Sequence, residues 1–126
     1  MSKRVIRIAA LFGAAAVGIG AFGAHGLKEV LIENNRADTF ETAVKYHFYH
    51  VFGAVLIGLI MTRTKERSSV LNFAALSMFI GIVLFSGSLY ILSLTGLTFL
   101  GAITPLGGVF FILGWILLFT GVKSNL

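Results

Sequence analysis

The chain has 126 residues, of which 57% are hydrophobic and only 12% are charged. A soluble domain of this size buries only about 60–70% of the surface that its unfolded chain exposes, so it could not hide this much apolar area. The composition therefore excludes an ordinary soluble domain and favours lipid as the solvent. Because the chain contains no cysteine, disulfides, thiolate chemistry and cysteine-bound metals are also excluded.

The formal net charge is +5, a value that can indicate a nucleic-acid partner. The lysines and arginines, however, are confined to short hydrophilic stretches between long apolar runs. Basic residues in such places are typical of topology signals that lie beside anionic headgroups. We therefore expect the partner to be the lipid bilayer and not nucleic acid.

The first apolar run, residues 6–25, is long enough to cross a hydrocarbon core of about 30 Å as a helix. Lys3, Arg4 and Arg7 precede its uncharged part, Ile8 to Ala24, so the beginning of the chain also resembles a signal peptide. We expect the segment to be retained as the first membrane span, because removing it would strand the rest of the pattern.

The only long polar stretch is residues 26–43, which we expect to form an external loop. Leu27, Val30 and Leu31 recur at helical spacing, which predicts a short interfacial helix within this loop. Asp38 and Glu41 have the spacing of a capping box, so we expect the second long helix to begin near Asp38.

The uncharged part of that second helix, Tyr46 to Thr62, predicts a span at about residues 44–62, and a tight basic loop follows at residues 63–67. From Ser68 to Val122 the chain carries no charge, a run too long for one helix across a bilayer. Thr95–Gly96 marks a break in this run. Pro105 marks the start of the next helix, because proline is tolerated in a first helical turn. The spans are therefore predicted at residues 70–92 and 103–122.

These four segments predict an all-α fold: a single domain over residues 1–126, built as a four-helix transmembrane bundle. Seven lysines and arginines lie at the two chain ends and in the basic loop, against three (Lys28, Arg36 and Lys45) in the polar stretch from Gly26 to Lys45. This excess favours both termini on the cytoplasmic side of a bacterial plasma membrane.

Small residues recur along two of the predicted spans. Gly107, Gly114 and Gly121 are spaced by seven residues, and Gly13 and Gly20 fall close to one face of the first span. Such stripes let helix backbones touch. We interpret them as packing sites within the bundle, with a homo-oligomeric interface as the alternative.

Polar side chains inside a membrane are costly, so those in the spans are the candidates for function. The predicted topology brings them all to the outer third of the bundle: His25, Tyr46, His47, His50, Ser86, Ser88, Tyr90 and Thr104. Histidines could there bind zinc, copper or haem iron, or a quinone. The spans contain no acid or cysteine to complete a metal set, so the metal and the cofactor stay open. Hydrogen bonding to the backbone, an aromatic belt, or proton handling are the alternatives.

No segment has the spacing of a phosphate-binding loop, a dinucleotide fingerprint, a zinc protease or a nucleophile elbow, and no catalytic residue is predicted. We therefore expect a non-enzymatic role that is structural, maintains the envelope or binds a partner. A small-ligand-binding protein and an oligomeric small-solute transport unit are the alternatives.

Several stretches together resemble the family called domain of unknown function 423, which are small inner-membrane proteins of the YgdD and YwdK type. They are "GAFGAHGL" (20–27), "FETAVKYHFYH" (40–50), "LFSGSLY" (84–90), "GAITPLGG" (101–108) and "GW" (114–115). The resemblance implies a four-helix membrane protein with no established activity, cofactor or substrate. Its motifs include His25, Tyr46, His50, Ser86, Ser88, Tyr90, Thr104 and Pro105. At the position of His47 the resemblance implies another polar residue in relatives, so it does not favour a three-histidine site.

Overall fold

The computed structural model of this chain describes residues 1–64 and 68–125, with side chains through residue 122. Most of the predicted basic loop, residues 65–67, lies outside the described residues. The elements follow in the order α1 (Ser2–Ala24), α2 (Lys28–Glu33), α3 (Ala37–Arg63), α4 (Ser69–Gly81), the π-helical turn η1 (Ile82–Ser86), α5 (Gly87–Thr95), the 3-10 helix η2 (Thr98–Ala102) and α6 (Thr104–Asn125).

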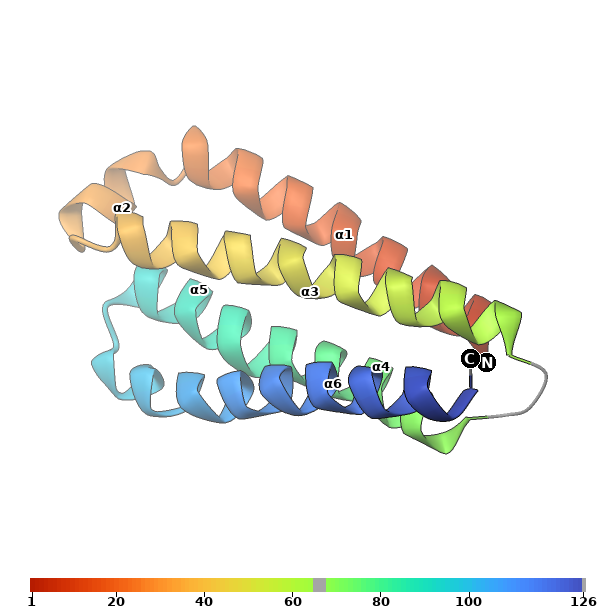
Figure 1. The fold of residues 1–126 in the computed structure, drawn as a ribbon. Coiled ribbons are helices and arrows are strands. Elements are labelled where there is room, and N and C mark those ends of the chain that lie inside the picture. The colour runs from red at the N-terminus through yellow and green to blue at the C-terminus, as the bar shows by residue number, and fades with distance from the viewer. Residues whose placement is uncertain (65–67, 126) are drawn as a thin grey trace.

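The predicted all-α fold is confirmed, and four helical spans within the described residues are long and apolar enough to cross a membrane. They are Ser2–Ala24, Ala37–Arg63, the continuous run Ser69–Thr95 formed by α4, η1 and α5, and Thr98–Val122. Both chain termini lie at one end of the bundle, which we call the terminal end (Figure 1). The short elements α2 and η2 lie at the opposite end, which we call the loop end.

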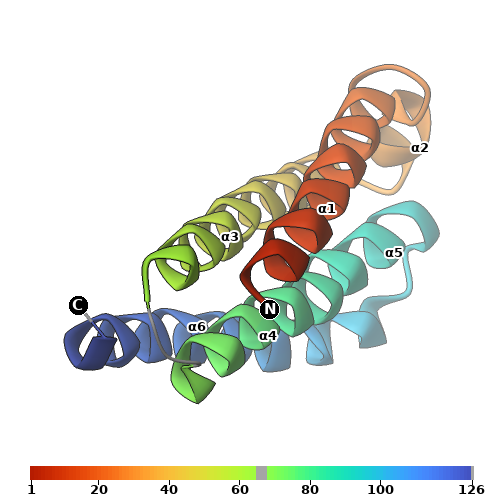
Figure 2. The same cartoon turned by 90° about the vertical axis from the view of Figure 1, so that its right-hand side faces the viewer.

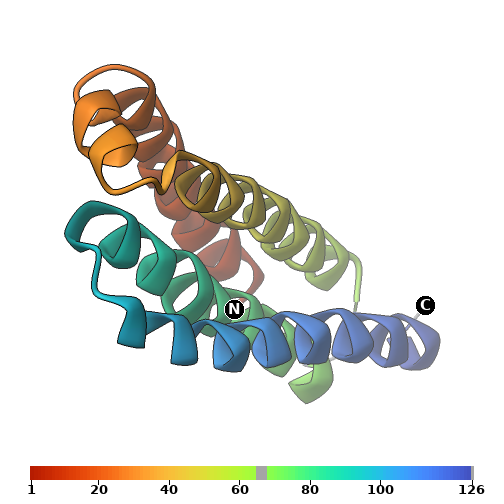
Figure 3. The same ribbon diagram turned by 90° about the vertical axis from the view of Figure 1, so that its left-hand side faces the viewer.

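The four spans pack as two pairs. α1 lies along α3, and α4 lies along α6. The two pairs form two layers, with α3 making most of the contact between them (Figures 2 and 3). α1 therefore has one packed side, toward α3, and makes few contacts with α4 or α5.

The ends of the helices follow their local chemistry. Ser68 caps α4, because its hydroxyl accepts a hydrogen bond from the Leu71 backbone N–H at 3.2 Å. Gly96 ends α5 in the left-handed conformation, with φ of +75°, which glycine adopts without steric cost. Pro105 is the second residue of α6, where its missing N–H costs no helical hydrogen bond.

The predicted capping box at Asp38 and Glu41 is wrong. α3 begins at Ala37 after Arg36, and no side chain caps it. Asp38 instead lies inside the first turn, where a carboxylate still interacts favourably with the helix dipole. Glu41 pairs with Lys45 at 3.2 Å, one helical turn further on.

Glycines allow the close packing within each pair. A side chain at Gly107 would collide with the backbone of Phe85 in η1, and Gly114 faces the Ala74 carbonyl of α4 at 3.3 Å from an ideal Cβ position. Gly121 similarly faces Leu71. On α1, Gly13 and Gly20 face valines of α3 at 3.4 Å. These five glycines therefore lie at helix contacts within one chain.

Candidate functional site

Serine hydroxyls join the helices in the half of the bundle nearer the loop end. Ser86, at the end of η1, is fully buried and donates to the Ala43 carbonyl of α3 at 2.7 Å. The hydroxyls of Ser88 on α5 and Thr104 on α6 are also 2.7 Å apart. These bonds satisfy polar groups that lipid would leave unpaired, so the three side chains connect helices.

His50 is enclosed between α3 and α6. Its Nδ1 lies 2.7 Å from the Tyr46 carbonyl one turn earlier, which makes Nδ1–H the donor. The ring lies parallel to that of Phe111 with centroids 3.4 Å apart, and Trp115 approaches it edge-on at 5.9 Å. An imidazole held by a carbonyl and stacked on one face is positioned as a packing element between the two helices.

Tyr46 lies at the surface of the same aromatic group. Its ring is 4.7 Å from that of Phe85 and 6.0 Å from that of His50, measured between centroids, and 40% of the residue is exposed. Its side chain therefore covers the His50 stack on the outside of the bundle.

His25 lies apart from this group. It is the exposed residue that ends α1 at the loop end. His50 is thirteen residues into α3, roughly 20 Å along the helix axis from the start of α3. Within residues 1–64 and 68–122, no hydrogen bond or ring contact joins His25 to the other candidates.

His47 has the most unusual environment of the candidates. It is only 3% exposed, and its Nδ1 lies 2.8 Å from the hydroxyl of Tyr90 on α5. Its Nε2 is buried and has no hydrogen-bond partner among the residues that the structure describes. The Phe12 carbonyl of α1 faces the ring, but no hydrogen bond of good geometry joins the two. A buried polar nitrogen without a partner lowers the stability of the fold by about 1–3 kcal/mol. Such a group in a native structure calls for an explanation, and a role in binding is one.

An apolar groove lies over His47 and Tyr90, between α1 and the run formed by η1 and α5. One part has a volume of about 410 Å³, and Phe12, His47, Val83 and Gly87 are among its lining residues. A second part, of about 490 Å³, continues toward the loop end. Ala15 and Tyr90 line both parts, so they form one groove, which we call the α1–α5 groove.

The divergence of the helices creates this groove. α1 approaches α4 through Phe12 and Phe79, whose ring centroids are 5.2 Å apart. Beyond this contact α1 follows α3 away from α5 (Figure 2). The groove faces the side of the bundle where lipid would lie, so a lipid-soluble molecule could reach it laterally.

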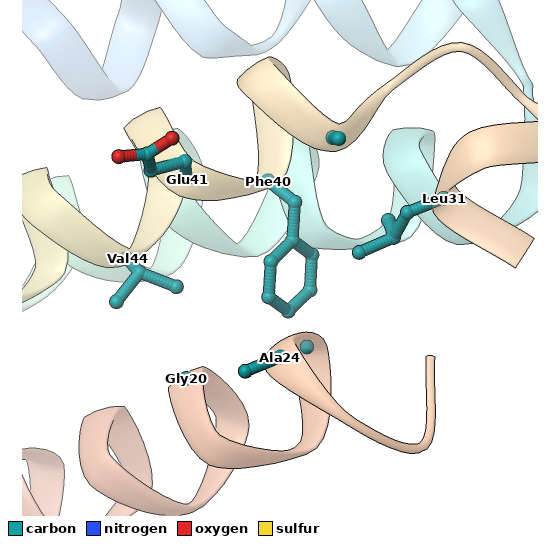
Figure 4. A pocket seen from close by; sticks show the side chains of 8 residues that line it. Gly20, Ala24, Leu31, Phe40, Glu41 and Val44 are labelled. Carbon is teal, nitrogen blue, oxygen red and sulfur yellow. The ribbon is translucent and has the colours of Figure 1, made fainter. Parts of the chain in front are cut away.

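A smaller cavity of about 300 Å³ lies at the loop end, between the end of α1, α2 and the start of α3. Phe40 points from α3 toward α1 and forms its wall, while Leu31 closes it from α2 (Figure 4). A side chain at Gly23 would collide with the Phe40 ring, so glycine is what allows α1 to come this close. Phe40 also lines the α1–α5 groove and divides the two spaces.

The described residues bring together no three histidine, cysteine or acidic side chains that could hold a metal ion. His47 and His50 are three residues apart on α3, yet His47 contacts Tyr90 of α5 and His50 contacts Phe111 of α6. Each histidine therefore faces a different neighbour. This arrangement suits a single imidazole that recognises an organic molecule better than a metal centre.

Comparison with known proteins fits this four-span architecture. The family model described as "Protein of unknown function (DUF423)" matches residues 19–108. The chain belongs to the DUF423 family.

Two bacterial relatives of this DUF423 protein cover nearly its whole length. The UPF0382 membrane protein YwdK of Bacillus subtilis is 48% identical over 92% of this chain and 93% of its own. The UPF0382 membrane protein SH2409 of Staphylococcus haemolyticus is 47% identical over 92% of each chain. No solved structure matches the DUF423 chain. Both relatives are named membrane proteins, in agreement with the four apolar spans described above.

Proposed function

We propose that this DUF423 protein binds a lipid-soluble organic molecule in the α1–α5 groove, with a non-enzymatic role. His47 carries the proposal, because its buried Nε2 lacks a partner beside a groove that is otherwise apolar. A ligand with an apolar body and one polar atom would complement both features.

The Tyr90 hydroxyl sets the chemistry that the ligand must offer. An imidazole nitrogen is a better acceptor than a phenol oxygen, so we assign the Tyr90 hydroxyl as donor to Nδ1. Nε2 then carries the proton and is a donor. A carbonyl oxygen, as in a quinone, is the simplest group to accept it. We infer that binding turns the Phe12 ring, which packs edge-on against His47 at 6.3 Å, away from Nε2.

Binding is favoured over catalysis by how the other hydroxyls are used. Ser86 and Ser88 bond to a carbonyl and to Thr104, so neither is poised beside a histidine as a nucleophile would be. The same proposal includes the orientation of the protein in the membrane. The distribution of basic residues favours both termini on the cytoplasmic side. The groove would then open toward the outer leaflet, because His47 and Tyr90 lie nearer the loop end.

The test is equilibrium binding of a benzoquinone with a decyl chain to the protein in lipid nanodiscs. We expect saturable binding of one molecule per chain. Replacing His47 by Phe removes one hydrogen bond, worth about 1.4 kcal/mol, and should raise the dissociation constant about tenfold. His47→Gln keeps a side-chain donor and should retain most of the affinity.

His25→Gln is the matched control, because His25 is exposed and contributes nothing to the groove. It should leave the dissociation constant unchanged. Binding that is non-saturable, or that His47→Phe and His25→Gln weaken equally, would refute the proposed function.

A further inference from the structure

A second apolar groove lies at the terminal end, between the first two turns of α1 and the first turns of α4. Its volume is about 240 Å³. Arg4 and Asn72 are among its lining residues, together with Ile8, Leu76 and Phe79, and the surface that the groove presents is almost entirely apolar. The Phe12–Phe79 contact separates it along α1 from the α1–α5 groove.

Polarity changes along this groove in one direction. α1 and α4 both begin at the terminal end, so Arg4 and Asn72 lie nearest that end of their helices. Ile8 and Phe79 lie one to two turns further in, about 6–11 Å along the axis. A phospholipid has the same order, with its headgroup at the membrane surface and its acyl chain directed inward.

The charge at the polar end is positive, and no ion pair within the described residues neutralises it. Lys3, Arg4 and Arg7 are all exposed, and the only ion pair among the described residues joins Lys45 to Glu41 at the other end of the bundle. Basic residues near an anionic membrane surface each contribute about 1 kcal/mol of attraction. A guanidinium can also bind a phosphate through two parallel hydrogen bonds.

Asn72 lies on the α4 side of the groove but offers no accessible acceptor. Its Oδ1 is buried and has no hydrogen-bond partner among the described residues. The exposed Arg4 beside apolar walls therefore favours a phospholipid whose headgroup is anionic.

We propose that the groove between α1 and α4 binds one anionic phospholipid. The phosphate contacts Arg4, and one acyl chain packs along Ile8, Leu76 and Phe79. This site is independent of the α1–α5 groove and stands whether or not that groove binds a ligand.

The experiment is native mass spectrometry of the detergent-purified protein titrated with dioleoyl-phosphatidylglycerol or dioleoyl-phosphatidylcholine. We expect one phosphatidylglycerol to be retained with about fivefold higher affinity than phosphatidylcholine, corresponding to about 1 kcal/mol. Arg4→Gln should abolish this preference. Free glycerol phosphate in excess should not displace the lipid.

Arg63→Gln is the charge-matched control, because Arg63 is an exposed arginine at the end of α3 and does not line the groove. It should leave the preference intact. Equal retention of the two lipids would overturn the proposal, as would an effect of Arg63→Gln as large as that of Arg4→Gln, which would show diffuse attraction. Displacement by glycerol phosphate would show a phosphate site without lipid recognition and would also overturn it.

Discussion

Gly107 allows α6 to cross η1 with the two backbones in contact. An added Cβ would collide with the backbone of Phe85, which cannot move aside as a flexible side chain could. We expect Gly107→Ala to lower the free energy of unfolding by about 1–3 kcal/mol, the usual cost of overpacking. The measurement is unfolding of the detergent-solubilised protein by sodium dodecyl sulfate.

Gly18→Ala is the control for this substitution, because a Cβ at Gly18 in α1 meets nothing within 4 Å. It should leave the free energy of unfolding within about 0.5 kcal/mol of the wild-type value. Equal destabilisation by the two substitutions would mean that α6 and η1 do not pack as closely as the structure has them.

For the polar residues of the spans, the sequence predicted which side chains to consider but not which partners they have. The cost of polarity in lipid singled out His47, His50, Ser86, Ser88 and Tyr90. The sequence could not tell which of them are satisfied within the chain, because their partners are backbone carbonyls and rings on other helices. His47 carried one available signal, since it falls in register with the buried residues Phe40, Ala43 and Ala54. No sequence signal indicated that Phe12 of α1 would contact the His47 ring.

At the scale of elements, η1 distinguishes the third span from a regular helix. Its five residues form a wider turn, which accommodates one residue more than an α-helix would between α4 and α5. Ser86 ends this turn, and Ser88 and Tyr90 follow immediately. The three side chains reach partners on two other helices, α3 and α6. Such turns are frequent at functional sites, and here one precedes the hydroxyls that line or support the α1–α5 groove.

Deleting Val83 from η1 should therefore be tolerated. The loss of one residue turns the wide turn into an α-helical one and leaves α4 and α5 facing their present neighbours. Deleting Leu76 from α4 should instead rotate everything after it by about 100° and abolish the folded state. Both residues are exposed, so lost burial does not distinguish the deletions.

Size-exclusion profiles of the two deletion variants in detergent are the measurement. A monodisperse peak is expected for the Val83 deletion and aggregation for the Leu76 deletion. Equal aggregation of the two variants would contradict the presence of an extra residue in a π-helical turn at η1.

The sequence predicted the number of long helices because charge, glycine and proline mark every break. The wider turn at η1 escaped prediction, since its apolar residues are indistinguishable from those of an ordinary span. The absent cap at Asp38 escaped for a different reason. The helix already begins at Ala37, so Asp38 is its second residue, two positions past the N-cap Arg36, and its side chain does not cap the helix.

At the scale of the whole molecule, the orientation in the membrane is a prediction that the natural lack of cysteine makes easy to test. Single cysteines at Ile32, in the exposed part of α2, and at Thr62, near the terminal end, create the only thiols in the chain. We expect a membrane-impermeant maleimide to label Ile32→Cys in intact cells. Thr62→Cys should react only after the membrane is disrupted, and the reverse pattern would place the termini outside.

The shape of the molecule also explains why the α1–α5 groove was not predicted. It exists because α1 follows α3 and leaves α5, and this divergence depends on the packing of whole helices and on the Phe12–Phe79 contact. Hydropathy describes each span separately and contains no information about the angle between two of them. The sequence placed polarity near one end of the bundle, and the structure adds the apolar space beside it.

Photo-crosslinking with an azide-bearing decyl-benzoquinone in nanodiscs tests the central claim, ligand binding beside His47, most directly. We expect adducts within residues 11–19 of α1 and 82–94 of η1 and α5, which excess unmodified quinone suppresses and His47→Phe removes. Adducts of equal yield along the exposed apolar face of α6, insensitive to competitor and to His47→Phe, would contradict it.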